Sequence, residues 1–266
     1  MKGVASRRGY ATWTSSTPMK TPLRSLALIA LSSAWLTAAR AADLPAPVAD
    51  TGYTPCKIHQ TVSPVFPPSL LASGIHRGEV QLTFEVGPLG RLGDTLVTAY
   101  THREFADEAL RAVKQWRFEP GVSGGQPVIS ILNFTFNFET TGVVAVAKYG
   151  KSLADPVGSG YAYQAHGVAT LDLPPIALNQ PGPVYPKAWI EQGRTGSVVI
   201  DFFIDETGQA RLPVNQSHTD EVLAASAIAA VAQWRFEPPT LHGHPVLVRA
   251  QQTFDFKPEP KSERSS

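Results

Sequence analysis

The pentapeptide WRFEP occurs twice in this chain, at Trp116–Pro120 and again at Trp234–Pro238. The same offset of 118 positions aligns residues 80–138 with the second copy without a gap. One register held over such a span is typical of an internal duplication. The sequence therefore predicts two homologous units in tandem, at residues 60–140 and 179–258.

Each copy has the pattern of a small mixed domain. Apolar residues alternate with more polar ones at 80–86 and 198–204, which predicts a strand with one buried face. A glycine-containing turn and a second strand follow. Apolar side chains at spacings of four, four and three between Phe105 and Trp116 then predict a helix. A last strand carries alternating phenylalanines. The predicted fold class is α+β, with two tandem β-β-α-β domains, each a three-stranded antiparallel sheet with a helix on one face.

Eight aromatic residues recur on the predicted buried faces, and we expect them to form the two cores. They are Phe84, Trp116, Phe118 and Phe136 in unit one, and Phe202, Trp234, Phe236 and Phe254 in unit two. Each tryptophan ends an apolar helical stripe, where an aromatic side chain more often anchors a core than stacks on a ligand. Arg117 and Arg235 point away from that stripe, and we expect each to pair with the glutamate two positions later.

The composition excludes several classes of protein. A hydrophobic fraction of 43% is enough for a packed core, and the single cysteine, Cys56, excludes an internal disulfide framework and a cysteine-based zinc site. Six of the 23 basic residues and none of the 22 acidic residues lie within the first 41 positions, so the remainder is mildly acidic. Such a body lacks the positive charge that neutralises phosphates, and we predict no nucleic-acid partner.

The sequence also lacks several motifs of common enzymes. It contains no Walker-type loop and no H-E-x-x-H. His242 and His244 have no third ligand nearby in the sequence, and His218 lies near Asp220 without a recognisable nucleophile. We therefore predict no enzymatic activity, no catalytic residue, no cofactor and no metal site.

The first 41 residues have the pattern of an N-terminal extension followed by a signal peptide. Lys20 and Arg24 flank the apolar run Leu26–Leu36, and Ala39–Ala41 supplies an A-x-A cleavage site. The chain is therefore predicted to be exported by the Sec route. The alternative is an uncleaved anchor, because residues 23–39 reach the lower limit for spanning a bilayer.

Three further segments lie outside the two units. They are a proline-rich linker at 42–59, a linker at 141–178 and a polar tail at 259–266. A connection as long as the second linker is unusual between compact units if it has no structure. Its Val143-Val144-x-Val146 sequence has the composition of a strand, which the sequence alone does not place.

These motifs resemble the C-terminal domain of TonB, the periplasmic energy transducer of Gram-negative bacteria. The shared pattern is an aromatic-Pro pair, a V-x-V-x-F strand with a glycine turn, a helix ending in W-R-[FY]-x-P and a final strand. Both copies carry it, so the resemblance covers most of the chain beyond residue 41. It implies a location in the periplasm and protein partners.

In that family the domain binds the TonB box, a short extended segment of outer-membrane transporters that adds to the sheet beside the last strand. An unpaired strand edge offers N–H and C=O groups to such a peptide. The resemblance therefore implies binding residues along both last strands, and a glutamine before the Tyr-Pro pair that Gln180 matches. The implied partner-binding residues are Val128, Ile129, Ile131, Asn133 and Thr135 in unit one, and Gln180, Val246, Leu247, Val248, Arg249, Gln251 and Thr253 in unit two.

Two features depart from the family pattern. Family transducers have a functional histidine in their membrane anchor and a long rod rich in Pro, Glu and Lys. Residues 19–41 contain no histidine, and only residues 44–68 are proline-rich. We therefore expect a periplasmic interaction protein that binds transporter segments at one or both sheet edges, with the tandem supplying avidity.

Two alternatives remain open at this point. One is an atypical membrane-anchored energy transducer for TonB-dependent transport, which alone would engage inner-membrane proton-channel partners. The other is a structural module in which the two units pair their sheet edges with each other, so that neither edge binds a peptide.

Overall fold

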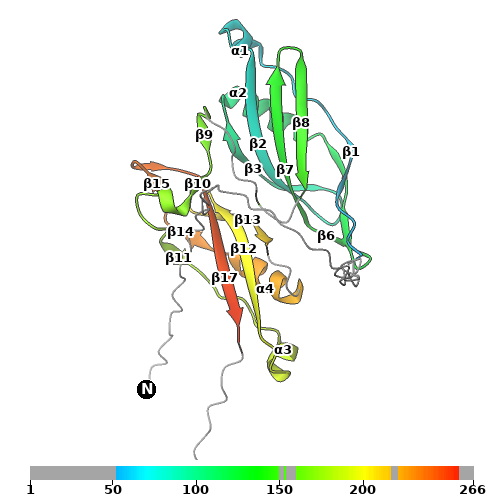
Figure 1. Ribbon diagram of the computed structural model, residues 1–266, viewed down its shortest axis with the longest axis vertical. Helices are drawn as coiled ribbons and strands as arrows, with labels where there is room; N and C mark the ends of the chain where they lie inside the picture. Colours follow the sequence, from blue (N-terminus) through cyan, green and yellow to red (C-terminus); the bar gives the residue numbers. More distant parts are fainter. Residues whose placement is uncertain (1–51, 150–152, 154–159, 217–220, 258–266) are drawn as a thin grey trace, which may run out of the picture.

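The computed structural model describes residues 52–149, 153, 160–216 and 221–257 (Figure 1). The predicted signal peptide or anchor, most of the first linker and the polar tail lie outside these residues. Among the helices that the structure describes, none has the length and apolar character needed to cross a membrane. The fold is mixed α+β and consists mostly of strands, in agreement with the predicted class.

The first unit is built on a five-stranded sheet in the order β8-β7-β2-β3-β9 (Figure 1). Its strands are β2 (Arg77–Val86), β3 (Leu92–Tyr100), β7 (Ser130–Glu139), β8 (Gly142–Tyr149) and β9 (Tyr163–Gln164). Helix α2 (Arg103–Val113) packs on one face of β2 and β3. All neighbouring strands are antiparallel. The predicted three strands are the central ones, and the chain adds a strand at each side.

The second unit repeats this plan with a four-stranded sheet in the order β10-β17-β12-β13. Its strands are β10 (His166–Gly167), β12 (Gly196–Ile204), β13 (Ala210–Asn215) and β17 (Val248–Phe256). Helix α4 (Glu221–Val231) packs on β12 and β13. Antiparallel pairs join β17 to β12 and β12 to β13, whereas β10 pairs with β17 in parallel over two residues.

Short elements complete both units. They are the helices α1 (Pro68–Ala72), η1 (Val168–Thr170) and α3 (Lys187–Glu191), and the paired strands β1 (Lys57–Gln60) with β4 (Arg117–Glu119), β5 (Gly121–Ser123) with β6 (Gln126–Val128), β11 (Ala177–Asn179) with β14 (Arg235–Phe236), and β15 (Thr240–Leu241) with β16 (His244–Pro245).

The prediction of three strands per sheet is wrong in both units, because segments assigned to linkers supply extra strands. Strands β8, β9 and β10 all come from the predicted linker at 141–178. Strand β1, at the end of the proline-rich linker, pairs with the WRFEP segment of unit one. Strand pairing satisfies the backbone N–H and C=O groups that these segments would otherwise leave to solvent.

Equivalent residues build the two cores. The side chains of Phe84, Trp116 and Phe136 are buried between sheet and helix in unit one, as are Phe202 and Trp234 in unit two. Each indole N–H also donates to the carbonyl of a residue in the preceding segment, Trp116 to Val62 at 2.8 Å and Trp234 to Pro181 at 2.9 Å. The two tryptophans therefore tie the entry segment of each unit to its core.

The glycine in each predicted hairpin turn has a steric role as well as a conformational one. Gly90 and Gly208 adopt φ angles of +70° and +84°. A Cβ at these positions would lie 2.4 Å from the carbonyl oxygen of Phe118 and 2.0 Å from that of Phe236, respectively. Only glycine lets the turn approach the strand that follows each helix.

The two sheets meet through the faces that carry no helix. Leu96 of β3 packs there with Phe203, Leu212 and Leu247 of unit two, and with Leu153 of the connecting segment. The residues that bridge the sheets lie close together in the chain: Tyr163 stacks on Tyr100 of β3, and the backbone N–H of His166 donates to Leu247 at 2.9 Å. The connecting segment thus adds to both sheets within five residues.

An ion-pair group also spans the two units. Arg211 of β13 donates through Nε to Asp94 of β3 at 2.8 Å and through a terminal nitrogen to Asp205 at 3.0 Å. Burial opposes ionisation of Asp205, but hydrogen bonds from Thr207, Gln209 and Arg211 outweigh it and lower the pKa of this carboxyl. A lowered pKa stabilises the fold above the ordinary carboxyl range, and that stabilisation is lost as the pH falls through the folded-state value.

We therefore expect Asp205→Asn to lower the free energy of unfolding by about 1–2 kcal/mol at neutral pH, because its charge-assisted hydrogen bonds are lost. The difference between wild type and variant should shrink at about pH 2, where the wild-type carboxyl is protonated. Urea unfolding at both pH values measures it. A difference that is the same at both values would contradict this role for Asp205.

Candidate functional site

The candidate site is the outer edge of β17 in unit two. The inner edge of this strand pairs with β12 along all nine residues, from Val248 to Phe256. The outer edge pairs with β10 only at Val248 and Arg249. Within the described residues, the rest of this edge has no strand beside it.

The direction of each backbone group along β17 follows from one hydrogen bond. The N–H of His166 in β10 donates to the carbonyl of Leu247, so Leu247 faces the outer edge. The N–H and C=O of one strand residue point to the same side, and successive residues alternate. The outward residues beyond β10 are therefore Gln251, Thr253 and Asp255, and no register shift interrupts the β12–β17 ladder.

In unit one the equivalent edge is closed. The residues 118 positions earlier are Asn133, Thr135 and Asn137 of β7, which pair with Lys148, Val146 and Val144 of β8. A two-residue turn between Glu139 and Gly142 returns the chain along the edge that β7 would otherwise expose (Figure 1). Both copies thus contain an equivalent last strand, whose outer edge is paired in unit one and is largely unpaired in unit two within the described residues.

A model of the family described as "Gram-negative bacterial TonB protein C-terminal" matches residues 62–140 and 181–258. The chain belongs to this TonB C-terminal family. The match confirms the predicted tandem of two TonB-like copies. Because TonB is a non-enzymatic energy transducer, it also confirms the prediction that the chain is not an enzyme.

Two TonB proteins are similar to part of the chain. Protein TonB of Vibrio cholerae serotype O1 is 33% identical over 90 residues, which cover 34% of this chain and 37% of that protein. The alignment therefore spans little more than a third of the length of this relative. The solution NMR structure of the Pseudomonas aeruginosa TonB C-terminal domain is 35% identical, with a TM-score of 0.28, and covers 32% of this chain and 85% of that chain.

In the first TonB-like unit, the predicted binding residues lie on or near the closed edge. Val128 ends β6, and Ile129 is exposed between β6 and β7. Ile131 packs against the cluster between the units. Asn133 is buried, and its side-chain oxygen accepts a hydrogen bond from Thr83 at 2.8 Å. Thr135 faces β8 through its backbone.

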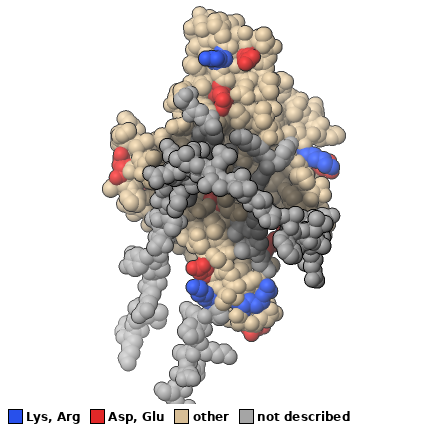
Figure 2. Space-filling view, in the orientation of Figure 1, with Lys and Arg blue, Asp and Glu red and all other residues tan. Residues whose placement is uncertain are grey.

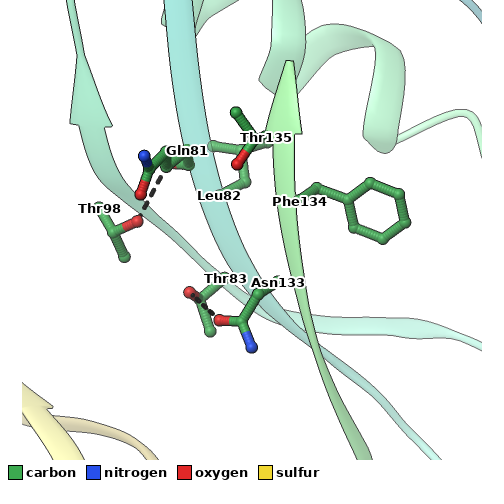
Figure 3. A pocket seen from close by; sticks show the side chains of 7 residues that line it. All are labelled: Gln81, Leu82, Thr83, Thr98, Asn133, Phe134 and Thr135. Carbon is green, nitrogen blue, oxygen red and sulfur yellow. Dashed lines mark hydrogen bonds between the residues drawn. The ribbon is translucent and has the colours of Figure 1, made fainter. Parts of the chain in front are cut away.

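The helix-free face of this sheet carries a small polar hollow (Figure 3). Its lining includes Gln81, Thr83, Thr98 and Asn133, whose side chains come from three adjacent strands. Thr98 donates to the carbonyl of Gln81 at 3.2 Å, beside the Thr83–Asn133 pair. These internal hydrogen bonds give the hollow a structural role in holding β3, β2 and β7 together.

In the second TonB-like unit, the predicted residues divide between core and edge. Leu247 and Val248 are buried, and Val246 packs partly against the core. Arg249 and Gln251 lie on the helix-free face and donate to the buried carboxylate of Asp201 at 2.7 and 2.8 Å. Thr253 is exposed on the open stretch of the edge.

Gln180 does not belong to this edge. It directly follows β11, which pairs with β14 outside the main sheet, and it precedes Pro181, whose carbonyl accepts the indole N–H of Trp234. Phe254 of the predicted core is only partly buried, beside Trp234. The sequence missed Asp255, which is the third outward residue of the open edge and is recognisable only from the register.

The expected pairs of Arg117 and Arg235 with neighbouring glutamates are not the contacts that form. Each guanidinium donates to the carbonyl of the tryptophan before it, at 3.2 Å for Arg117 and 2.8 Å for Arg235. Oε1 of Glu119 instead lies 3.8 Å from Nζ of Lys57. Arg117 begins β4 and Arg235 begins β14, so each contact joins the guanidinium to the backbone just before its own strand.

The distribution of charged side chains does not indicate a second binding site within the described residues. On the face shown in Figure 2, basic and acidic side chains are few and interspersed, without a basic field. The parts of the chain that the structure describes contain no group of three or more His, Cys, Asp and Glu side chains suited to a metal ion. His242 and His244 lie at the β15–β16 turn, where the backbone N–H of His242 donates to Asp172 at 2.8 Å, and His218 lies outside the described residues.

Proposed function

We propose that this chain is a periplasmic interaction protein whose second TonB-like unit binds an extended segment of a TonB-dependent outer-membrane receptor by strand addition. The observation that carries the proposal is the open outer edge of β17 at Gln251, Thr253 and Asp255, on a domain of the TonB C-terminal family. An added strand would pair with outward N–H and C=O groups that no neighbouring strand uses.

The first unit has a different role in this proposal. Strand β8 already occupies the edge that a peptide would need, over eight residue pairs from Leu132 to Glu139. A peptide could add to β7 only by displacing β8 and its backbone hydrogen bonds. Unit one therefore acts as a structural support that holds unit two through the interface around Leu96 and Phe203. This differs from the self-paired module considered from the sequence, in which the two units pair their edges with each other, because the strand beside β7 is β8 of the same unit.

Disulfide trapping tests which edge binds. Synthetic N-terminal peptides of TonB-dependent receptors from the bacterium that encodes this chain, each with one cysteine activated as a 2-pyridyl disulfide, are mixed with full-length Thr253→Cys protein, so that attack by the protein thiolate forms the mixed disulfide and releases pyridine-2-thione. We expect a disulfide to form with at least one peptide, because Thr253 is exposed on the open edge. The native Cys56 should not compete, because burial, with a contribution from Glu119, raises the pKa of its thiol.

The matched control is Thr135→Cys, at the equivalent position of the closed edge. It should give little disulfide with the same peptides, because Val146 of β8 lies beside Thr135. Mass spectrometry of the trapped species identifies the peptide and the cysteine used. Equal trapping at the two positions, or trapping at Thr135→Cys alone, would overturn the assignment to β17.

A further inference from the structure

Strand β8 provides an internal template for whatever adds to β17. Strands β7 and β17 have the same register on their inner neighbours, β2 and β12. Phe136 pairs with Val80 in unit one, and the residues 118 positions later, Phe254 and Val198, pair with each other in unit two. A strand that added to β17 in the way that β8 adds to β7 would run antiparallel to it, in the direction opposite to β10, which pairs in parallel with Val248 and Arg249 of the same edge. The residue beside each position of β17 can then be read from β8.

Between residues 252 and 256, three of the five β17 residues are identical to their equivalents in β7. Val143, Ala145 and Val146 of β8 lie beside Phe138, Phe136 and Thr135, and the equivalent residues of β17 are again Phe, Phe and Thr. The side chains of Val143 and Ala147 pack against the core of unit one. The template therefore predicts small or β-branched apolar residues beside Phe256, Phe254 and Thr253.

One difference between the β7 and β17 edges is at Gln252, where a polar amide takes the place of the apolar ring of Phe134 in unit one. The Gln252 side-chain amide donates to the carbonyl of Thr253 at 2.8 Å, and that carbonyl faces the open edge. Its side-chain oxygen is buried, and the described residues offer it no hydrogen-bond donor. A buried acceptor without a partner is costly. A hydroxyl or amide on the added strand, in the place of Ala147, would supply the missing donor.

The second difference is at Asp255, which replaces Asn137. The Asp255 side chain is exposed on the helix-free face, and no ion pair is formed by it within the described part of the chain. In unit one the residue beside this position is Val144, which is 64% exposed. A basic side chain in the place of Val144 would pair with the carboxylate across the two strands.

We propose that the β17 edge selects an antiparallel segment whose side chains are apolar beside Phe256, basic beside Asp255, small and apolar beside Phe254, β-branched beside Thr253, and hydroxyl- or amide-bearing beside Gln252. The inference rests on the proposed strand addition at β17 and adds the chemistry of the segment that is recognised. Gln252 and Asp255 are the specificity-determining residues of the edge.

Two synthetic peptides test this selection. One has the sequence of β8 itself, GVVAVAKY (residues 142–149), and the other carries Val144→Lys and Ala147→Thr. Each is labelled with a fluorophore and titrated with the full-length chain by anisotropy. We expect the altered peptide to bind roughly tenfold more tightly, because it adds one cross-strand ion pair and one hydrogen bond.

The matched protein variants are Gln252→Phe and Asp255→Asn, which place the unit-one residues in unit two. In the double variant the preference should reverse toward the unaltered β8 peptide. Thermal unfolding of the variant checks that unit two still folds. Gln252→Met, which keeps the length of the side chain without its amide, replaces Gln252→Phe if the larger ring perturbs the core.

The outcomes separate this inference from the proposed function. Equal affinity for both peptides, or a preference that persists in the double variant, would overturn the selection while strand addition at β17 stands. Failure of both peptides to bind, when receptor peptides are still trapped at Thr253→Cys, also overturns the selection alone. Failure of all peptides, including the receptor peptides, would overturn both proposals.

Discussion

Proline at Thr253 should reduce binding of receptor peptides by more than tenfold while leaving the fold of unit two intact. The N–H of Thr253 faces the outer edge and not β12, so its loss removes no hydrogen bond of the β12–β17 ladder. Proline removes that donor and places its ring where the incoming backbone must lie. Fluorescence anisotropy with the trapped receptor peptide measures the affinity, and circular dichroism reports the helix and sheet content.

Thr135→Pro is the control for the same substitution in unit one. The N–H of Thr135 faces β8, so proline breaks a hydrogen bond in the β7–β8 ladder and should destabilise unit one by about 1–3 kcal/mol. Peptide affinity should remain close to that of the wild type. If Thr253→Pro binds normally and Thr135→Pro does not, the peptide adds to unit one after displacing β8, and the assignment of the site is wrong.

Truncation of Trp234 to alanine should have the largest effect on stability, about 3–5 kcal/mol for unit two. Its side chain is 2% exposed, with aromatic neighbours Phe202, Phe236 and Phe254. The substitution leaves a cavity and also removes the hydrogen bond to the carbonyl of Pro181. Urea unfolding followed by circular dichroism should show an early transition for unit two before that of unit one.

Trp234→Phe separates the two contributions. It keeps most of the buried ring but removes the indole N–H, so it should cost about 1 kcal/mol from the hydrogen bond and the lost volume. A loss for Trp234→Ala no larger than that for Trp234→Phe would show that Trp234 is not a core anchor. Peptide binding should fall with Trp234→Ala only in so far as unit two unfolds.

The local elements could be predicted from the sequence because their signals are local. The spacing of apolar residues between Phe105 and Trp116 corresponds to α2, and the alternation at 80–86 corresponds to β2. Because the chain is duplicated, each pattern occurs twice in the same register, and the second copy supports the assignment made from the first. The turn glycines Gly90 and Gly208 stood out for the same reason.

The extra strands could not be placed from the sequence, because strand pairing is a long-range choice. The β8 segment has strand composition, yet nothing local states that it returns along β7 and not along another edge. Comparison of the two copies could not settle this, because the positions 118 residues after β8, from residue 260 onward, do not repeat its valine pattern. The two-residue strands β9 and β10 are shorter than any periodic pattern can reveal.

Only part of the candidate site could be predicted, because whether an edge is open depends on long-range strand pairing. The sequence located both last strands, and so named Thr135 and Thr253 with equal weight. Their difference lies in a neighbouring strand and in the direction of backbone groups, which depend on register. Gln252 was assigned no role, since its position in the alternation marks the core face and only the unpartnered oxygen distinguishes it.

Strand β8 also affects how the duplicated chain folds. Tandem copies with interchangeable strands are prone to misassembly, in which a strand of one copy joins the sheet of the other. The two-residue turn at Thr140 and Thr141 makes the β7–β8 pairing much more local in the chain than any pairing of β7 with β12 or β17, so its loop-closure entropy cost is smaller. Closure of the β7 edge by β8 is therefore favoured over capture of that edge by a strand of the second copy, and the two copies can fold separately.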